Sequence, residues 1–228
     1  MKRYLRAAML SIALAAATSA SAQLYEIANQ IPQLIQPALS GSVNYKGFVE
    51  TGFAGGVGNY KANVLSISTS QGFRYSNWFY MGVGIGLDVM FGQDTGVRAP
   101  DNPDYDVWDR YYNHSNTTTA YFLPLFTDFR FNIGANEKGR ASAFIDVKVG
   151  ASFMLNNSYF QVGGGYITNR ENFYLKPSIG VRIPVNSKNS HQAISIGASY
   201  QLVTANWWYV GSRNICLSAI GGTVAFEW

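Results

Sequence analysis

The stretch WFYMGVGIGLDVMF, Trp78 to Phe91, decides the fold. Successive side chains of a β-strand point to opposite sides, and here every second residue is apolar, while those between are mostly glycine or polar. A typical soluble strand has about 5 or 6 residues, whereas a tilted strand needs roughly 9–11 to cross a bilayer. The stretch therefore predicts a membrane-spanning strand. Its expected lipid-facing residues are Phe79, Met81, Val83, Ile85, Leu87, Val89 and Phe91.

The same alternation recurs in further segments from Tyr45 to Trp228, and together they predict eight antiparallel strands. Val147, Ile179 and Val181 belong to the apolar faces of these segments, so we expect them to face lipid as well. Closing such a sheet into an up-and-down barrel removes its exposed edges. The fold class predicted is all-β, an eight-stranded antiparallel transmembrane β-barrel.

Charged residues of the predicted strands all fall on the face opposite the apolar one. A Lys or Arg facing lipid at the middle of a bilayer costs about 2–4 kcal/mol, and the interior of an eight-stranded barrel is just wide enough for side chains to fill. Buried charges need partners. We therefore predict a network of ion pairs and hydrogen bonds among these charges that plugs the lumen; a narrow path for protons or ions is the alternative. The network comprises Lys46, Glu50, Asp88, Asp128, Arg130, Asp146, Lys148, Lys176, Arg182 and Glu227.

The connections between the predicted strands are alternately short and long. The short ones are 74–77, 135–139 and 186–190; the long ones are 55–61, 92–118, 156–171 and 205–214. Short turns on one side and long loops on the other are typical of bacterial outer-membrane barrels, with both chain ends on the periplasmic side. Aromatic residues near strand ends, Trp207 and Trp208 among them, fit the two aromatic girdles of such a barrel.

The amino-terminal residues 1–22 read as a cleaved secretory signal peptide, with a basic start, an apolar run and a small-residue cleavage site at Ala20-Ser21-Ala22. Residues 23–42 form a helical or irregular periplasmic leader, broken by Pro32 and Pro37, and residues 43–228 form the barrel. The signal contains three of the chain's 17 basic residues, so the remainder is nearly balanced against 13 acidic residues. This balance gives no reason to expect nucleic acid as a partner.

Segments such as YKGFVETGF (Tyr45 to Phe53) and SAFIDVKVGASF (Ser142 to Phe153) resemble the small outer-membrane β-barrel proteins, OmpA-like or PorT-like, of Bacteroidota type. The resemblance implies a barrel in the outer membrane, surrounded by its lipid. The last residues, GGTVAFEW, are similar to the carboxy-terminal signal read by the barrel-assembly machinery, with Phe226 and Trp228 as its aromatic residues. The glycine of that signal stands at Gly222 and not at Thr223.

The long loop 92–118 is the predicted surface-contact segment, because functional residues concentrate on loops of rigid scaffolds. Its acids and aromatics suit a surface glycan or a protein partner. The fixed pattern of a calcium-binding EF-hand is missing, so no metal or other cofactor is expected. The residues singled out are Asp101, Asp104, Asp106, Trp108, Tyr111 and Tyr112.

An enzyme would need His114 or His191, the only histidines of the chain. Small barrels that modify lipid A place histidine, serine and acids near the outer surface, and His114 precedes Ser115 in the long loop. No nucleophile motif frames this serine. The prediction is a non-enzymatic protein with a structural or surface-interaction role. The alternatives are a small hydrophobic-solute channel or a lipid A-modifying enzyme and, third, a soluble ligand-binding barrel with its apolar face inward.

Overall fold

The computed structural model describes residues 44–76, 78–92, 116–134, 140–163, 165–186, 189–208 and 212–228. The predicted signal peptide and leader lie outside these residues. The barrel is built from long strands, and the described residues contain no helix long and apolar enough to span a membrane. The long strands are β1 (Asn44–Val57), β2 (Ala62–Arg74), β3 (Phe79–Gly92), β5 (Thr119–Ile133), β6 (Ser142–Met154), β9 (Glu171–Asn186), β10 (Asn189–Trp208) and β11 (Ser212–Glu227).

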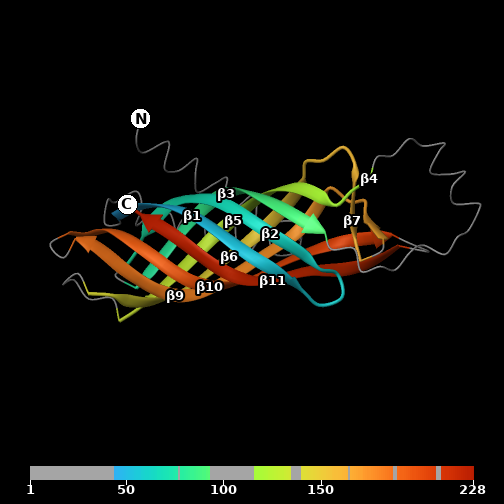
Figure 1. Ribbon diagram of the computed structural model, residues 1–228. Helices are drawn as coiled ribbons and strands as arrows, with labels where there is room; N and C mark the ends of the chain where they lie inside the picture. Colours follow the sequence, from blue (N-terminus) through green and yellow to red (C-terminus); the bar gives the residue numbers. More distant parts are fainter. Residues whose placement is uncertain are drawn as a thin grey trace, which may run out of the picture.

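Each long strand pairs antiparallel with the next one along the chain, and β11 returns to pair with β1 (Figure 1). The sheet is therefore closed, which leaves no long edge strand with unpaired backbone groups. This confirms the predicted eight-stranded antiparallel up-and-down barrel. We call the end that holds Asn44 and Trp228 the terminal end, and the opposite end the loop end.

The strand register keeps the two faces of the barrel chemically separate. Between β2 and β3, Leu65 pairs with Val89 and points outward, whereas Ser66 pairs with Asp88 and points inward. The period-2 alternation of one strand thus meets the same alternation in its neighbour. A slip by one residue would put every inward polar group on the outer face, so the pattern itself specifies the register.

The hairpin formed by β10 and β11 is longer than predicted. Segment 205–214 was expected to be a loop, but the pairing of β10 with β11 continues through Asn206–Asn214 to Trp208–Ser212. Strand β10 accordingly has 20 residues. The long connection expected here is short, and the extra residues extend the sheet at the loop end.

Short strands cover the loop end of the barrel. They are β4 (Asn116–Thr117), β7 (Tyr159–Val162) and β8 (Gly165–Ile167). β7 and β8 form a hairpin inside the segment 156–171, which the sequence predicted only as a long connection between strands. β8 pairs with the end of β10, and β7 pairs with β4 (Figure 1).

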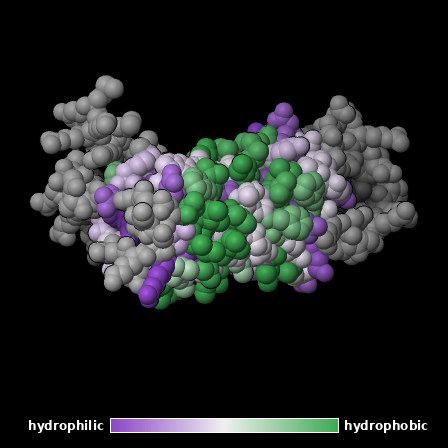
Figure 2. All heavy atoms as spheres, turned by 60° about the vertical axis from the view of Figure 1, so that its left-hand side comes forward, coloured by the Kyte–Doolittle hydropathy of each residue, from purple (hydrophilic) through white to green (hydrophobic). Residues whose placement is uncertain are grey.

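On the face shown in Figure 2, apolar side chains form a band across the middle of the barrel, with more polar surface toward both ends. Large apolar side chains point outward from the long strands, and Ile179, in the middle of β9, is the most exposed of them at 61%. A soluble protein rarely exposes so large a continuous apolar surface. The exterior is therefore suited to an apolar surrounding and not to water.

Candidate functional site

The interior of the barrel is the only part of the described structure where the predicted charged residues meet. All of them are buried, with exposures between 0% and 6%. None lies on the outer face. The interior is nevertheless not uniform, because ionic residues fill the part toward the terminal end and apolar residues fill the part toward the loop end.

The ionic part begins with three residues near the terminal end. Glu227 accepts two hydrogen bonds from Arg182, at 2.6 Å from Nε and 3.0 Å from Nη2. Lys46 Nζ lies 2.8 Å from Glu227 Oε1. A two-point guanidinium–carboxylate contact fixes both side chains in one geometry. This group links β1, β9 and β11, so it joins both strands of the closing pair to β9, which lies beyond β10 in the barrel.

A second ionic group crosses the middle of the lumen. Glu50 accepts hydrogen bonds from Lys148 at 2.7 Å and from Lys176 at 2.9 Å. Lys148 also donates to Asp146 at 2.7 Å, and Arg130 lies 3.4 Å from the same carboxylate oxygen. Each of these cations therefore faces at least one carboxylate. Buried charges are tolerated in a protein interior only when they are paired in this way.

Arg130 is also held by two aromatic rings. Its guanidinium carbon lies 4.3 Å from the centre of the Phe48 ring and 4.5 Å from that of Phe144. A guanidinium over an aromatic face gains electrostatic and packing energy. The sequence placed both phenylalanines on the inward face, but gave no signal that they would enclose one arginine.

Two of the predicted network acids have neutral partners. Gln201 donates to Asp88 Oδ2 at 2.8 Å, and Ser70 donates to Asp128 Oδ2. No ion pair among the described residues joins either acid to a cation. Hydrogen bonds from neutral side chains therefore complete the network beside the ion pairs, and Ser70, Tyr80 and Gln201 are members that the charge pattern did not reveal. The only sequence signal for these three residues was their place in the alternation, which puts them on the inward face of their strands.

The part of the interior toward the loop end is an apolar plug, which the sequence did not predict. Phe160 and Ile167, from the β7–β8 hairpin, are fully buried, and Phe160 packs edge to face on Phe122 with ring centres 6.0 Å apart. Paired charges therefore fill only part of the lumen. The hairpin supplies the rest of the filling, because it folds back into the mouth of the barrel.

Trp207 anchors this hairpin. It was predicted to lie in an outer aromatic girdle, but it points inward with 6% exposure and donates from Nε1 to the Val162 carbonyl at 2.9 Å. Gly165 lies under the indole, where a Cβ would overlap the ring. Trp208, one residue later, points outward at 41% exposure. Two adjacent tryptophans cannot share one face of a strand, and the tertiary pairing with β8 decides which one is inside.

One small void lies beside the apolar plug. A void lined by Val64, Met90, Val203 and Leu217, among others, has a volume of about 10 Å³. That is roughly the space of one water molecule. This void is therefore too small to hold a solute larger than water.

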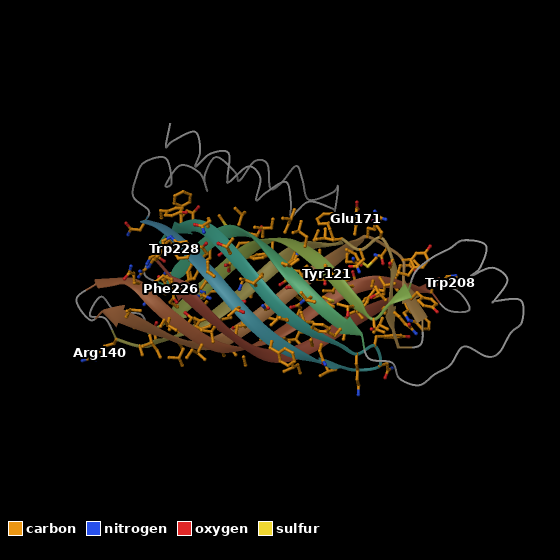
Figure 3. The ribbon with its side chains drawn as sticks, turned by 45° about the horizontal axis from the view of Figure 1, so that its top comes forward. Tyr121, Arg140, Glu171, Trp208, Phe226 and Trp228 are labelled. Atoms are coloured by element: carbon orange, nitrogen blue, oxygen red, sulfur yellow. The ribbon has the colours of Figure 1, made fainter. Side chains whose placement is uncertain are left out.

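The outward residues lie where the alternation predicted. Val147, Ile179, Val181 and the apolar face of β3 all point outward. Aromatics gather toward the two ends: Phe226 and Trp228 lie near the terminal end and Trp208 near the loop end (Figure 3). The Phe226 and Trp228 rings stack with centres 6.2 Å apart.

The residues proposed for surface contact or catalysis are not placed by the structure. Asp101, Asp104, Asp106, Trp108, Tyr111 and Tyr112 lie outside the described residues, as do Asp109, His114 and Ser115. His191 belongs to the backbone of β10. Within the described residues, no group of His, Cys, Asp and Glu side chains is arranged to hold a metal ion.

These features define a class: a closed eight-stranded β-barrel with an apolar exterior and a lumen filled partly by ion pairs and partly by an apolar plug. No protein-family model matches the chain. No curated protein matches it either.

Several solved structures follow a similar course of the chain at low sequence identity. Neisserial surface protein A (NspA) has 9% identity and a TM-score of 0.48, covering 80% of this chain and 95% of its own. The outer membrane enzyme PagL has 10% identity and a TM-score of 0.45, and the match covers 79% of this chain and 97% of PagL. The N-terminal β-barrel domain of Pseudomonas aeruginosa OprF has 10% identity and a TM-score of 0.37, and the match covers 82% of this chain and 99% of that domain.

Proposed function

We propose that this protein is an integral outer-membrane β-barrel with a structural or surface-interaction role and a sealed lumen. The observation that carries the proposal is the apolar band around the barrel, combined with the burial of every charge of the predicted network (Figure 2). In lipid, each backbone polar group must be satisfied internally, and a closed barrel achieves this. The terminal end faces the periplasm and the loop end faces the cell surface.

The filled lumen supports a role other than transport. The ion-paired groups block one part of the lumen, and the β7–β8 hairpin with Trp207 blocks the other. A solute would have to displace both. Contact with a surface glycan or a protein through loop 92–118 is the interaction that we propose, on the chemistry of the loop sequence.

Three narrower proposals accompany this function. They are the removal of residues 1–22 as a signal peptide, the kinship with OmpA-like or PorT-like barrels, and the recognition of Phe226 and Trp228 by the barrel-assembly machinery. The outward, stacked position of these two aromatic rings at the last strand supports the third.

Location and lumen can be tested together. The full chain, expressed with its amino-terminal segment, is expected in the outer-membrane fraction, and it should migrate faster on gels before boiling than after. Refolded protein in planar bilayers should show no stable conductance steps. Recovery in the soluble fraction without detergent would overturn the membrane assignment, and large, stable conductance would overturn the sealed lumen.

The role of the loop needs a separate test on whole cells. A variant with Trp108, Tyr111 and Tyr112 changed to alanine is compared with one in which Asp101, Asp104 and Asp106 are changed to asparagine. Binding to a panel of surface polysaccharides and envelope proteins should fall in at least one of the two while the amount of folded barrel stays constant. A changed lipid A profile in cells that lack the gene would favour an enzyme instead.

A further inference from the structure

Two acidic side chains in the ionic part of the lumen lie next to each other. Asp128, on β5, pairs across the sheet with Lys148, and Asp146, on β6, pairs with Arg130. The two aspartates are therefore diagonal neighbours, and both point inward with at most 1% exposure. Diagonal neighbours on one face of a sheet lie within reach of each other's side chains, so the two carboxyl groups lie side by side in the lumen.

One oxygen of each carboxyl group has no donor in the described structure. Asp128 Oδ2 accepts from Ser70, and Asp146 Oδ2 accepts from Lys148 and Arg130. Asp128 Oδ1 and Asp146 Oδ1 are both buried and without a hydrogen-bond partner. Buried acceptors left without a donor are rare and each needs an explanation.

A proton between the two carboxyl groups supplies the missing donor. Ionised carboxylates only accept hydrogen bonds, so two of them cannot bond to each other unless one is protonated. Two negative charges on adjacent buried side chains also repel each other strongly, and paired carboxyl groups in other proteins share one proton for that reason. One proton thus converts two unsatisfied acceptors into one hydrogen bond.

The neighbours decide which aspartate holds the proton. Lys148 and Arg130 both contact Asp146 and stabilise its negative charge. Asp128 instead accepts a hydrogen bond from the neutral hydroxyl of Ser70. The Tyr80 hydroxyl lies 3.2 Å from the same serine oxygen. The titratable and charged groups packed around the pair are thus Glu50, Tyr80, Arg130 and Lys148, from four different strands.

We propose that the barrel binds one proton between Asp128 and Asp146, carried on Asp128 Oδ1 and donated to Asp146 Oδ1. Hydrogen bonds then run through these side chains in one continuous chain. Tyr80 donates to Ser70, Ser70 donates to Asp128, and Asp128 donates to Asp146. Asp146 also accepts a hydrogen bond from Lys148. Lys148 bridges in turn to Glu50 at 2.7 Å. The proposal depends on the interior alone and stands whatever the loops bind.

Infrared spectroscopy of the full chain, refolded in detergent, tests the proton directly. At neutral pH the protein should show the carbonyl stretch of a protonated carboxylic acid, and labelling with ¹³C-aspartate should shift that band. The band should disappear in Asp128→Asn and remain in the matched control Asp88→Asn. Absence of the band in the unmodified protein would overturn the proposal, as would its loss in Asp88→Asn with retention in Asp128→Asn.

Stability measurements give a second, independent readout. Asparagine at position 128 can donate its amide to Asp146 and accept from Ser70, so Asp128→Asn should keep the unfolding midpoint of the unmodified protein. Asp146→Asn should lower that midpoint and the folded yield, because Lys148 and Arg130 then lose a carboxylate. Failure of Asp128→Asn to fold, or a loss of stability equal to that of Asp146→Asn, would contradict the proposal.

Discussion

Gly47 and Trp228 join the first and last strands at the terminal end. The amide N–H of each donates to the carbonyl of the other at 3.1 Å, and the Trp228 indole lies directly over the Gly47 backbone. The aromatic end of the chain thus packs into a space that only a glycine leaves free. This contact extends the β1–β11 pairing that closes the barrel.

Gly47→Ala should weaken the closure. A Cβ at position 47 would lie 2.5 Å from the Trp228 ring and 2.7 Å from Gln71 Oε1, so the indole must move. Overpacking of this kind costs typically about 1–3 kcal/mol. The folded band on unboiled gels should disappear at a lower temperature.

Gly55→Ala is the matched control for this change. Gly55 lies on the same strand, and a Cβ there would meet nothing closer than 3.9 Å. Its thermal transition should stay close to that of the unmodified protein. Equal effects of the two substitutions would mean that the Trp228 contact does not contribute to closure.

A lysine in the middle of the apolar band tests the membrane assignment. Ile179→Lys should lower the free energy of unfolding from lipid vesicles by about 2–4 kcal/mol, because the ammonium group would face hydrocarbon. Ile133→Lys, at the last position of β5, should cost only about 0–1 kcal/mol, because it lies near the membrane surface. In a water-soluble barrel both lysines would be tolerated, so equal and small effects would refute the assignment.

Glu50→Gln tests the central ionic group. The amide cannot balance Lys148 and Lys176, which donate to this side chain at 2.7 Å and 2.9 Å. Removing one partner of a buried ion pair costs about 3–5 kcal/mol, measured as unfolding in urea. Asp88→Asn keeps an oxygen for Gln201 and should cost about 1 kcal/mol or less. A larger loss of unfolding free energy for Asp88→Asn than for Glu50→Gln would show that the ion pairs of Glu50 are not the main support of the ionic part of the lumen.

Trp207→Phe tests the anchor of the β7–β8 hairpin. The substitution keeps a ring but leaves the Val162 carbonyl without its donor in an apolar environment. The expected cost is about 1–3 kcal/mol, and amide hydrogen exchange in β7 and β8 should speed up. Trp208→Phe, on the outer face, should change stability by about 0.5 kcal/mol or less. Unchanged exchange in Trp207→Phe would mean that the hairpin is held by other contacts.

The sequence alone determined the strands, their order around the barrel and the face on which each strand residue lies. Successive side chains of a strand alternate between its two faces, so the positions of Val83 and Asp88 along β3 place one outward and the other inward. A slip of one residue in the strand pairing would reverse both faces. The burial of the charged residues followed for the same reason. Closure was predicted because a sheet of eight long strands would otherwise leave exposed edges.

The filling of the lumen was decided only by tertiary structure. Parity put Asp88 and Asp128 inside, but not Gln201 and Ser70 against them, because those partners lie 113 and 58 residues away in sequence. Likewise Trp207 and Phe160 have side chains typical of a membrane girdle or a surface loop. They are buried because the β7–β8 hairpin folds into the mouth of the barrel, and such long-range packing leaves no periodic signal in a single sequence.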